Sequence, residues 1–126
     1  LDRIDIQVEV SAVDYKALSG KADGSSSQEI RKQVEETRQL QRDRFSSGEM
    51  TNSHMSEKDI REHCKLGEDA SAMLKDIVDR LGFSARGYTK ILKVSRTIAD
   101  LEGSDEIQLE HVAEAVQYRT LDRVML

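Results

Sequence analysis

Apolar residues recur at helical spacing over most of the chain, from about residue 27 onward. The clearest stripe recurs at positions i, i+1, i+4, i+5 and i+8 and consists of Met73, Leu74, Ile77, Val78 and Leu81. This spacing places the five side chains on one face of an amphipathic helix. We therefore predict a helix that Glu68 and Asp69 open and that Gly82 closes.

The same reasoning predicts four further helices. They cover about residues 27–46, 57–65, 85–102 and 109–120. Serines stand at the N-cap positions of the first three, where a hydroxyl accepts a hydrogen bond from the first turn; they are Ser26, Ser56 and Ser84. The inward face of the first is expected to carry Ile30, Val34, Thr37, Leu40 or Gln41, and Phe45. Gly48 to Met55 is expected to be a loop. The predicted fold is all-α, a bundle of four to five helices.

The beginning of the chain has a different pattern. Ile4, Ile6, Val8 and Val10 alternate with polar residues, which is the period of a half-buried strand. One strand cannot satisfy its own backbone groups, so we expect it to pair with a sheet supplied by a longer parent chain. The expected organisation is the last strand of a core domain at 1–13, a flexible Gly- and Ser-rich linker at 14–25, and a helical domain at 26–126.

Composition narrows the class of protein. A chain of 126 residues has room for one hydrophobic core, and the lack of proline with only 4% aromatic residues disfavours sheet-rich folds. No apolar run approaches the roughly 20 residues that span a bilayer, so we expect no membrane partner. A single cysteine, Cys64, excludes an internal disulfide and a CxxC zinc site and favours a cytoplasmic location. The net charge of −5 argues against a dedicated nucleic-acid module.

The first turn of the helix at 85–102 breaks two local rules. Arg86 places a cation at the positive end of the helix dipole, and Gly87 lowers helix propensity. A phosphate bound by the N–H groups of this turn and by the guanidinium would offset the unfavourable position of the Arg86 charge. Gly87, which has no side chain, would leave room for the phosphate to approach the backbone. The alternative interpretation is a solvated surface arginine beside a tolerated glycine.

Arg3 is a second candidate, since an arginine at the end of a strand can reach a phosphoryl group across a subunit boundary. A surface ion pair is the alternative. His54, the pair His63 and Cys64, and His111 form no ligand set of known spacing, so we interpret them as structural and expect no metal site. Arg38, Arg42 and Arg44 are expected on a solvated helix face, with contact to phosphate or to a neighbouring subunit as the alternative.

Three segments resemble one family. LDRIDIQVEV at 1–10, SARGYTKILKVSRTIADLEGSDEIQLEHVAEAVQYR at 84–119 and the RxHC pattern at 61–64 are similar to the C-terminal part of magnesium chelatase-like AAA+ ATPases of the ComM (YifB) type. The resemblance implies that Arg3 is an arginine finger acting in trans. It also implies that Arg86, with Gly87, belongs to a sensor 2 motif that contacts the γ-phosphate of ATP on a lid domain.

The resemblance also carries expectations about the parent protein. The chain has no GxxxxGK[ST] loop and no acidic strand end, so alone it should neither bind ATP tightly nor hydrolyse it. The parent is expected to be an ATPase that uses ATP and Mg2+, forms a homo-oligomeric ring, commonly a hexamer, and remodels DNA in branch migration during natural transformation and recombination. Two alternatives stay open: the lid of a true magnesium chelatase subunit, and a free-standing helical adaptor that binds a protein partner. If the chain is the lid of a ComM-type ATPase or of a true magnesium chelatase subunit, we expect the AAA+ core of the same parent chain to be its partner.

Overall fold

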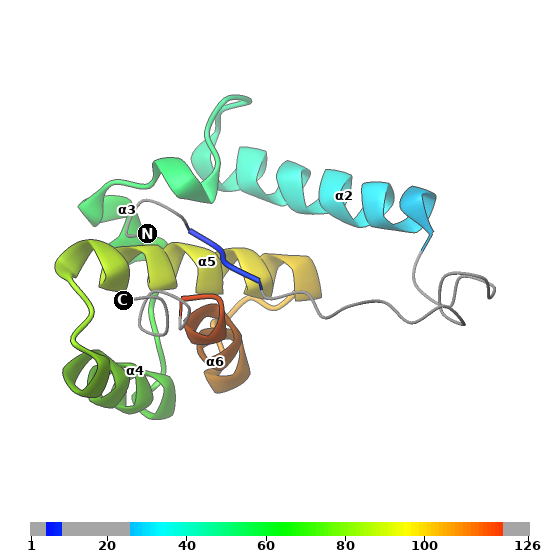
Figure 1. The fold of residues 1–126 in the computed structure, drawn as a ribbon. Helices are drawn as coiled ribbons and strands as arrows, with labels where there is room; N and C mark the ends of the chain where they lie inside the picture. Colours follow the sequence, from blue (N-terminus) through cyan, green and yellow to red (C-terminus); the bar gives the residue numbers. More distant parts are fainter. Residues whose placement is uncertain (1–4, 9–25, 120–126) are drawn as a thin grey trace, which may run out of the picture.

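The computed structural model describes residues 5–8 and 26–119, and over these it is an all-α fold (Figure 1). Its helical elements are α2 (Ser27–Phe45), the 3-10 helix η1 (Asn52–His54), α3 (Glu57–His63), α4 (Glu68–Leu81), α5 (Ala85–Glu102) and α6 (Leu109–Gln117). Within the described ranges, β pairing is limited to one isolated bridge between Leu66 and Ile107. The predicted helical bundle is confirmed.

Helix α5 lies at the centre of the bundle. It packs against α2, η1 and α3 on one side and against α6 on the other, and α4 packs in turn against α6. Figure 1 shows this arrangement, with α2 above α5 and with α4 and α6 on the opposite side of α5. Because α5 contacts most of the other elements, residues along it connect the whole domain.

Local capping explains where the helices begin and end. The hydroxyls of Ser26, Ser56 and Ser84 accept hydrogen bonds from backbone N–H groups three residues later. Gly82 and Gly103 adopt left-handed conformations, with φ of 64° and 75°, and end α4 and α5. A residue with a side chain is disfavoured at these angles, so glycine ends both helices as predicted.

Three boundaries differ from the prediction. Helix α3 ends at His63 rather than near Lys65, because Gly67 is the N-cap of α4 and the intervening residues form the bridge to Ile107. Helix α6 ends at Gln117 rather than Thr120. The predicted loop from Gly48 to Met55 contains η1, whose first residue, Asn52, is buried.

The core lies between α5 and its neighbours. Small and aliphatic side chains fill it, namely Met55, Cys64, Ala70, Leu74, Ile91, Leu92, Val94, Ala99, Ile107, Val112, Ala115 and Val116. Met73, Ile77 and Val78 of the predicted α4 stripe pack against this cluster while remaining partly exposed. No helix in the described part of the chain is long and apolar enough to cross a membrane.

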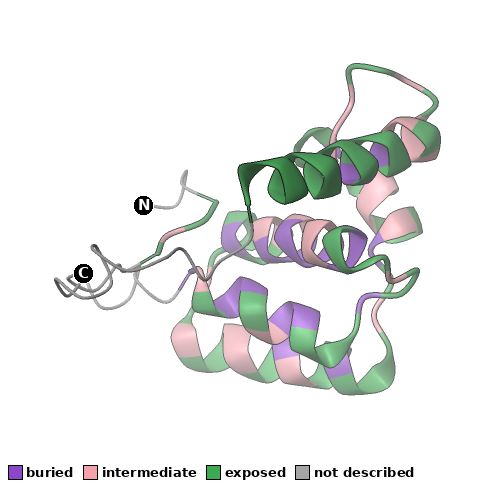
Figure 2. Cartoon of the chain, turned by 90° about the vertical axis from the view of Figure 1, so that its right-hand side faces the viewer, coloured by how far each residue is buried: buried purple, intermediate pink, exposed green. Residues whose placement is uncertain are grey.

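The predicted inner face of α2 is only partly correct. Thr37 and Gln41 are buried, whereas Ile30, Val34 and Leu40 are exposed. Figure 2 shows the N-terminal half of α2 as exposed almost throughout. The helix extends past α5, so its first turns have no packing partner among the described elements, and its second half is held mainly by polar contacts.

The predicted strand is only partly described. Residues 5–8 are neither helix nor strand, and they contact the helical domain through a hydrogen bond from the Gln7 N–H to the Tyr118 carbonyl (2.9 Å). The remaining residues of that strand, and the predicted linker at 14–25, lie outside the described residues. Pairing with a sheet of the parent chain and the domain boundary near residue 26 therefore remain predictions.

Candidate functional site

The first turn of α5 is fixed by its cap. The Ser84 hydroxyl accepts a hydrogen bond from the Gly87 N–H (3.0 Å), and the turn contains no acidic residue. The N–H groups at the start of an α-helix have no partner within the helix, and the helix dipole makes this end electropositive. The turn that carries Arg86 is therefore built to favour an anion.

Arg86 is exposed and lines an open groove of about 580 Å3. The groove also contains Lys90 and Lys93, which follow Arg86 on the same face of α5, and Glu57 at the start of α3. Three cations against one carboxylate make this groove positive on a chain whose net charge is −5. The two lysines were not among the predicted site residues, although their spacing of four and seven residues from Arg86 places them on the same helix face.

The three cations differ in what holds them. Lys90 forms an ion pair with Asp5, and the Lys93 ammonium donates to the Ser53 carbonyl (3.0 Å). Arg86 forms no hydrogen bond or ion pair with any residue that the structure describes. Its guanidinium is thus available to an anion at the surface.

Gly87 is buried against the start of its own helix. A Cβ built there would lie 3.5 Å from the Phe83 Cβ and 3.5 Å from the Ser84 Oγ, which are ordinary contact distances. The internal packing therefore does not require glycine at this position. A need for glycine would come from a group that approaches the turn from outside.

A buried ionic cluster lies near the other end of α5, around Asp100. The Arg44 guanidinium donates to both carboxylate oxygens (2.6 and 2.8 Å), the Arg96 Nε donates to Oδ1 (3.1 Å), and the Asn52 amide donates to Oδ2 (2.8 Å). The Asp100 side chain is fully buried. This cluster connects α2, η1 and α5. Arg44 therefore lies in an internal ion pair, which corrects its prediction as part of a solvated helix face.

Arg96 is almost entirely buried, with 4% of its surface exposed. Besides Asp100, its guanidinium donates to the carbonyls of His63 (3.3 Å), Ser104 (2.7 Å) and Asp105 (3.0 Å). The His63 carbonyl lies at the end of α3, and the carbonyls of Ser104 and Asp105 lie in the loop after α5. The Nε and both terminal nitrogens of Arg96 therefore donate to acceptors within the fold.

Two of the histidines act as caps. The Nδ1 of His111 accepts the Gln108 N–H (2.8 Å) while its Nε2 lies 2.6 Å from a Glu102 carboxylate oxygen. The Nδ1 of His54 accepts the Thr51 N–H (3.2 Å) in the turn that starts η1. Both contacts are structural, as the sequence analysis interpreted them.

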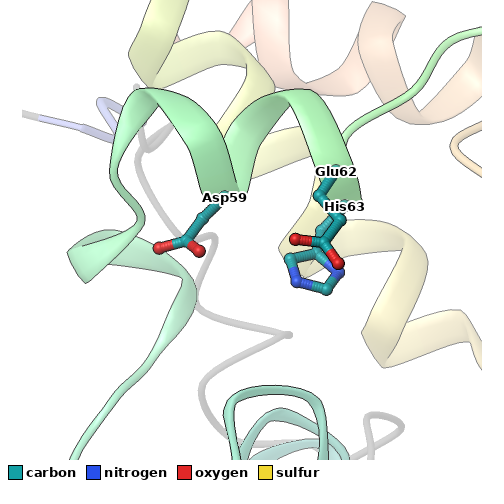
Figure 3. Close-up of side chains that lie close together, drawn as sticks. All are labelled: Asp59, Glu62 and His63. Carbon is teal, nitrogen blue, oxygen red and sulfur yellow. The ribbon is translucent and has the colours of Figure 1, made fainter.

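Figure 3 shows Asp59, Glu62 and His63 on α3, whose potential ligand atoms lie within 4.8 Å of one another. Asp59 accepts the Ser56 N–H (3.1 Å) as part of the capping box, and this hydrogen bond lowers the pKa of the Asp59 carboxyl. The His63 ring packs edge-on against Phe45, with ring centroids 5.6 Å apart. Capping and packing account for the positions of these two side chains without an ion.

Cys64 is a core residue. Its thiol lies 3.9 Å from the Met55 sulfur, and burial raises its pKa to about 11. The thiolate is the reactive form of cysteine, so Cys64 is inert near neutral pH. Arg3, the candidate arginine finger, lies outside the described residues.

The domain that contains both ends of α5 matches a known protein family. Residues 24–119 match the family model described as magnesium chelatase, subunit ChlI C-terminal. The chain belongs to this family. The matched range begins just before α2 and ends at the last described residue, so it includes both the groove at Arg86 and the cluster around Asp100.

Curated relatives agree with this assignment. The chain is 38% identical to the competence protein ComM of Haemophilus influenzae over 126 residues and 35% identical to the uncharacterized protein YifB of Salmonella typhimurium over 127. These alignments cover 99% and 100% of the chain but 24% of each relative. The chain therefore spans about a quarter of the length of these relatives, and corresponds to the C-terminal lid domain of a magnesium chelatase-related AAA+ protein.

Proposed function

We propose that this chain is the nucleotide-sensing lid of an AAA+ ATPase and that Arg86 contacts the γ-phosphate of ATP bound to the core of its own subunit. The observation that carries the proposal is the surroundings of Arg86. It is an exposed guanidinium without a described partner, on the electropositive first turn of α5, in a groove with two lysines.

The chemistry of the groove fits a phosphate group. A guanidinium donates in a fork that matches phosphate oxygens, and the helix dipole adds to the attraction. When bound, ATP with Mg2+ would supply the phosphoryl group whose presence or absence the lid reports. In this proposal the residues of this chain bind and orient the γ-phosphate. The phosphate loop and the Mg2+ ligands would come from the core of the parent protein.

The function of the parent is part of the same proposal. ComM, a competence protein by name, is 38% identical over the chain, which favours a motor that remodels DNA during transformation and recombination over other chelatase-related activities. In this proposal the subunits form a ring in the cytoplasm, and Arg3 completes the ATP site of the neighbouring subunit. The groove is positive but small, so DNA contact is assigned to other parts of the motor.

The sensor role is tested by Arg86→Ala in the full-length parent protein. We expect ATP turnover to fall by about tenfold or more, since one charge-assisted hydrogen bond contributes roughly 1.5–3 kcal/mol. Arg80→Ala is the matched control, because Arg80 is an exposed arginine that pairs with Asp76 on its own helix. Wild-type affinity and turnover in Arg86→Ala would show that the sensor assignment is wrong.

The trans role of Arg3 has a separate test. Arg3→Ala should abolish hydrolysis while ATP binding and ring assembly are retained, because the residue would act on charge that develops during phosphoryl transfer. Mixing Arg3→Ala subunits with subunits that cannot bind ATP should restore some turnover at mixed interfaces. Unchanged turnover in the single variant would contradict the assignment.

A further inference from the structure

The groove at Arg86 contains a carboxylate from a second helix. Among the described residues that line the groove, Glu57 alone lies outside α5. Glu57 is the first residue of α3, which packs against α5 (Figure 1). The other lining residues lie on one face of α5 and are Ala85, Arg86, Thr89, Lys90 and Lys93. An anion that enters the groove therefore meets a cationic helix face and the carboxylate of Glu57.

The backbone at Glu57 is held in place on both sides. The Ser56 hydroxyl accepts the Asp59 N–H (3.2 Å), and the Ser56 N–H donates to the Asp59 carboxylate (3.1 Å), so a capping box fixes the first turn of α3. Just before this turn, the Asn52 amide of η1 donates to the Thr97 hydroxyl of α5 (3.0 Å). The start of α3 is thus anchored beside α5, and Glu57 lies at the groove because of where its backbone is held.

The charges of Glu57 and Arg86 are not used by the fold. Both side chains are exposed, and neither forms a hydrogen bond or an ion pair with any residue that the structure describes. The backbone N–H groups of Ala85 and Arg86, in the first turn of α5, likewise have no acceptor within the described ranges. The donors of α5 and the carboxylate of Glu57 are therefore all able to act on an anion in the groove.

The size of the groove sets how strongly Glu57 acts. A volume of about 580 Å3 is several times that of a phosphate group, so water separates the carboxylate from a bound anion. Across water, at low ionic strength and at separations of this order, one unit charge changes the affinity for a doubly charged anion by about two- to fivefold. Glu57 thus weakens phosphate binding without abolishing it.

We infer that Glu57 opposes phosphate in the groove at Arg86 and keeps its affinity low enough for the phosphate to leave. Hydrolysis of ATP by water yields ADP and inorganic phosphate, and the γ-phosphate is then no longer tethered to the nucleotide. Repulsion by Glu57 favours its departure at that stage. The part of this inference that concerns ATP rests on the proposed function, whereas the effect of Glu57 on free phosphate does not.

The effect on free phosphate is measured in the 126-residue chain. Inorganic phosphate is titrated at low ionic strength, and the NMR signals of the Ala85 and Arg86 amides report binding. Glu57→Gln should bind phosphate about two- to fivefold more tightly than the wild type, because it removes one negative charge from the groove. Glu57→Asp, which keeps the charge, should bind it with an affinity close to that of the wild type.

Glu62→Gln is the matched control. It removes the same charge from the same helix, but Glu62 is exposed and does not line the groove, so phosphate affinity should stay close to that of the wild type. Pyrophosphate carries more charge than phosphate, and the gain in Glu57→Gln should be larger for it. Added NaCl should reduce the gain for both ligands. A change in the packing of α3 would not scale with the charge of the ligand.

The consequence for turnover is measured in the full-length parent as product inhibition. Glu57→Gln should lower the inhibition constant of inorganic phosphate by about two- to fivefold, the same factor as in the 126-residue chain. Glu62→Gln should leave this constant unchanged. Equal inhibition by phosphate in the wild type and in Glu57→Gln would overturn the role of Glu57 in phosphate release.

The results also separate this inference from the proposed function. If phosphate shifts neither amide, or if Glu57→Gln and Glu62→Gln change the affinity equally, the inference is wrong. The proposed function still stands in that case if Arg86→Ala lowers turnover. If Arg86→Ala leaves nucleotide affinity and turnover at wild-type level, the sensor assignment fails. A gain in phosphate affinity confined to Glu57→Gln would then still show that Glu57 opposes free phosphate.

Discussion

Helix α5 carries two arginines in opposite surroundings. Arg96 is buried, pairs with Asp100 and donates to three backbone carbonyls at the ends of neighbouring elements. Arg86, ten residues earlier, is exposed and has no hydrogen bond or ion pair within the described part of the chain. The same side chain thus serves the fold at one end of the helix and is available to a ligand at the other.

The comparison shows how to separate a structural arginine from a binding one. A guanidinium has five N–H donors, and burial requires that they be satisfied by the protein. At Arg96 the protein supplies the acceptors. At Arg86 solvent does, and a phosphate can replace it. Substitutions at the buried end of α5 are therefore expected to change the stability of the domain. Substitution of Arg86 at the exposed end is expected to change the response to nucleotide.

The largest expected effect is on the buried cluster. Asp100→Ala leaves Arg44 and Arg96 buried without their shared carboxylate, which should lower the free energy of unfolding by about 3–5 kcal/mol. Urea denaturation of the 126-residue chain at pH 7 measures it. Asp76→Ala is the control, because it breaks an exposed pair with Arg80 and should cost less than about 1 kcal/mol. Equal losses in the two variants would remove the contrast between the ends of α5.

The helices and their ends were predictable because their signals are local. A serine cap, an apolar stripe and a closing glycine lie within a few residues of one another, and Ser84 with Gly103 bounds α5 as expected. The electrostatic anomaly at Arg86 was also visible, since the helix dipole depends only on position within the helix. The family resemblance then implied a role for Arg86 as a γ-phosphate sensor, which stays a proposal.

The buried cluster could not be placed from local pattern, because its partners come from distant parts of the chain. Arg44 and Asp100 are 56 residues apart. One signal was present: Arg96 and Asp100 share a helix face with the buried Leu92 and Ala99, where charge is unusual. The exposed face of α2 was unpredictable for a related reason, since periodicity does not tell how far a helix extends beyond its neighbours.

A smaller effect is expected at Gly87. Gly87→Ala should raise the free energy of unfolding by up to about 1 kcal/mol, because alanine has the higher helix propensity and its Cβ meets only ordinary contacts at 3.5 Å. The thermal midpoint of the 126-residue chain measures this. In the full-length parent the same variant should weaken the response to nucleotide if the phosphate approaches this turn. Destabilisation of the chain would instead show that the turn needs glycine for its own packing.

The smallest effect on stability is expected at Arg86. Arg86→Ala should change the free energy of unfolding of the 126-residue chain by less than about 0.5 kcal/mol, because the side chain is exposed and no described residue depends on it. Parallel urea titrations with Asp100→Ala measure the contrast directly. A loss near that of Asp100→Ala would mean that Arg86 belongs to the fold.

The central claim is that Arg86 recognises the γ-phosphate, and one ratio tests it. In the full-length parent, the affinity for a non-hydrolysable ATP analogue is divided by the affinity for ADP, in the wild type and in Arg86→Ala. The account predicts that the ratio falls by about tenfold or more in the variant, since a charge-assisted contact to the γ-phosphate would be lost while those to the other phosphates remain. An unchanged ratio would contradict it.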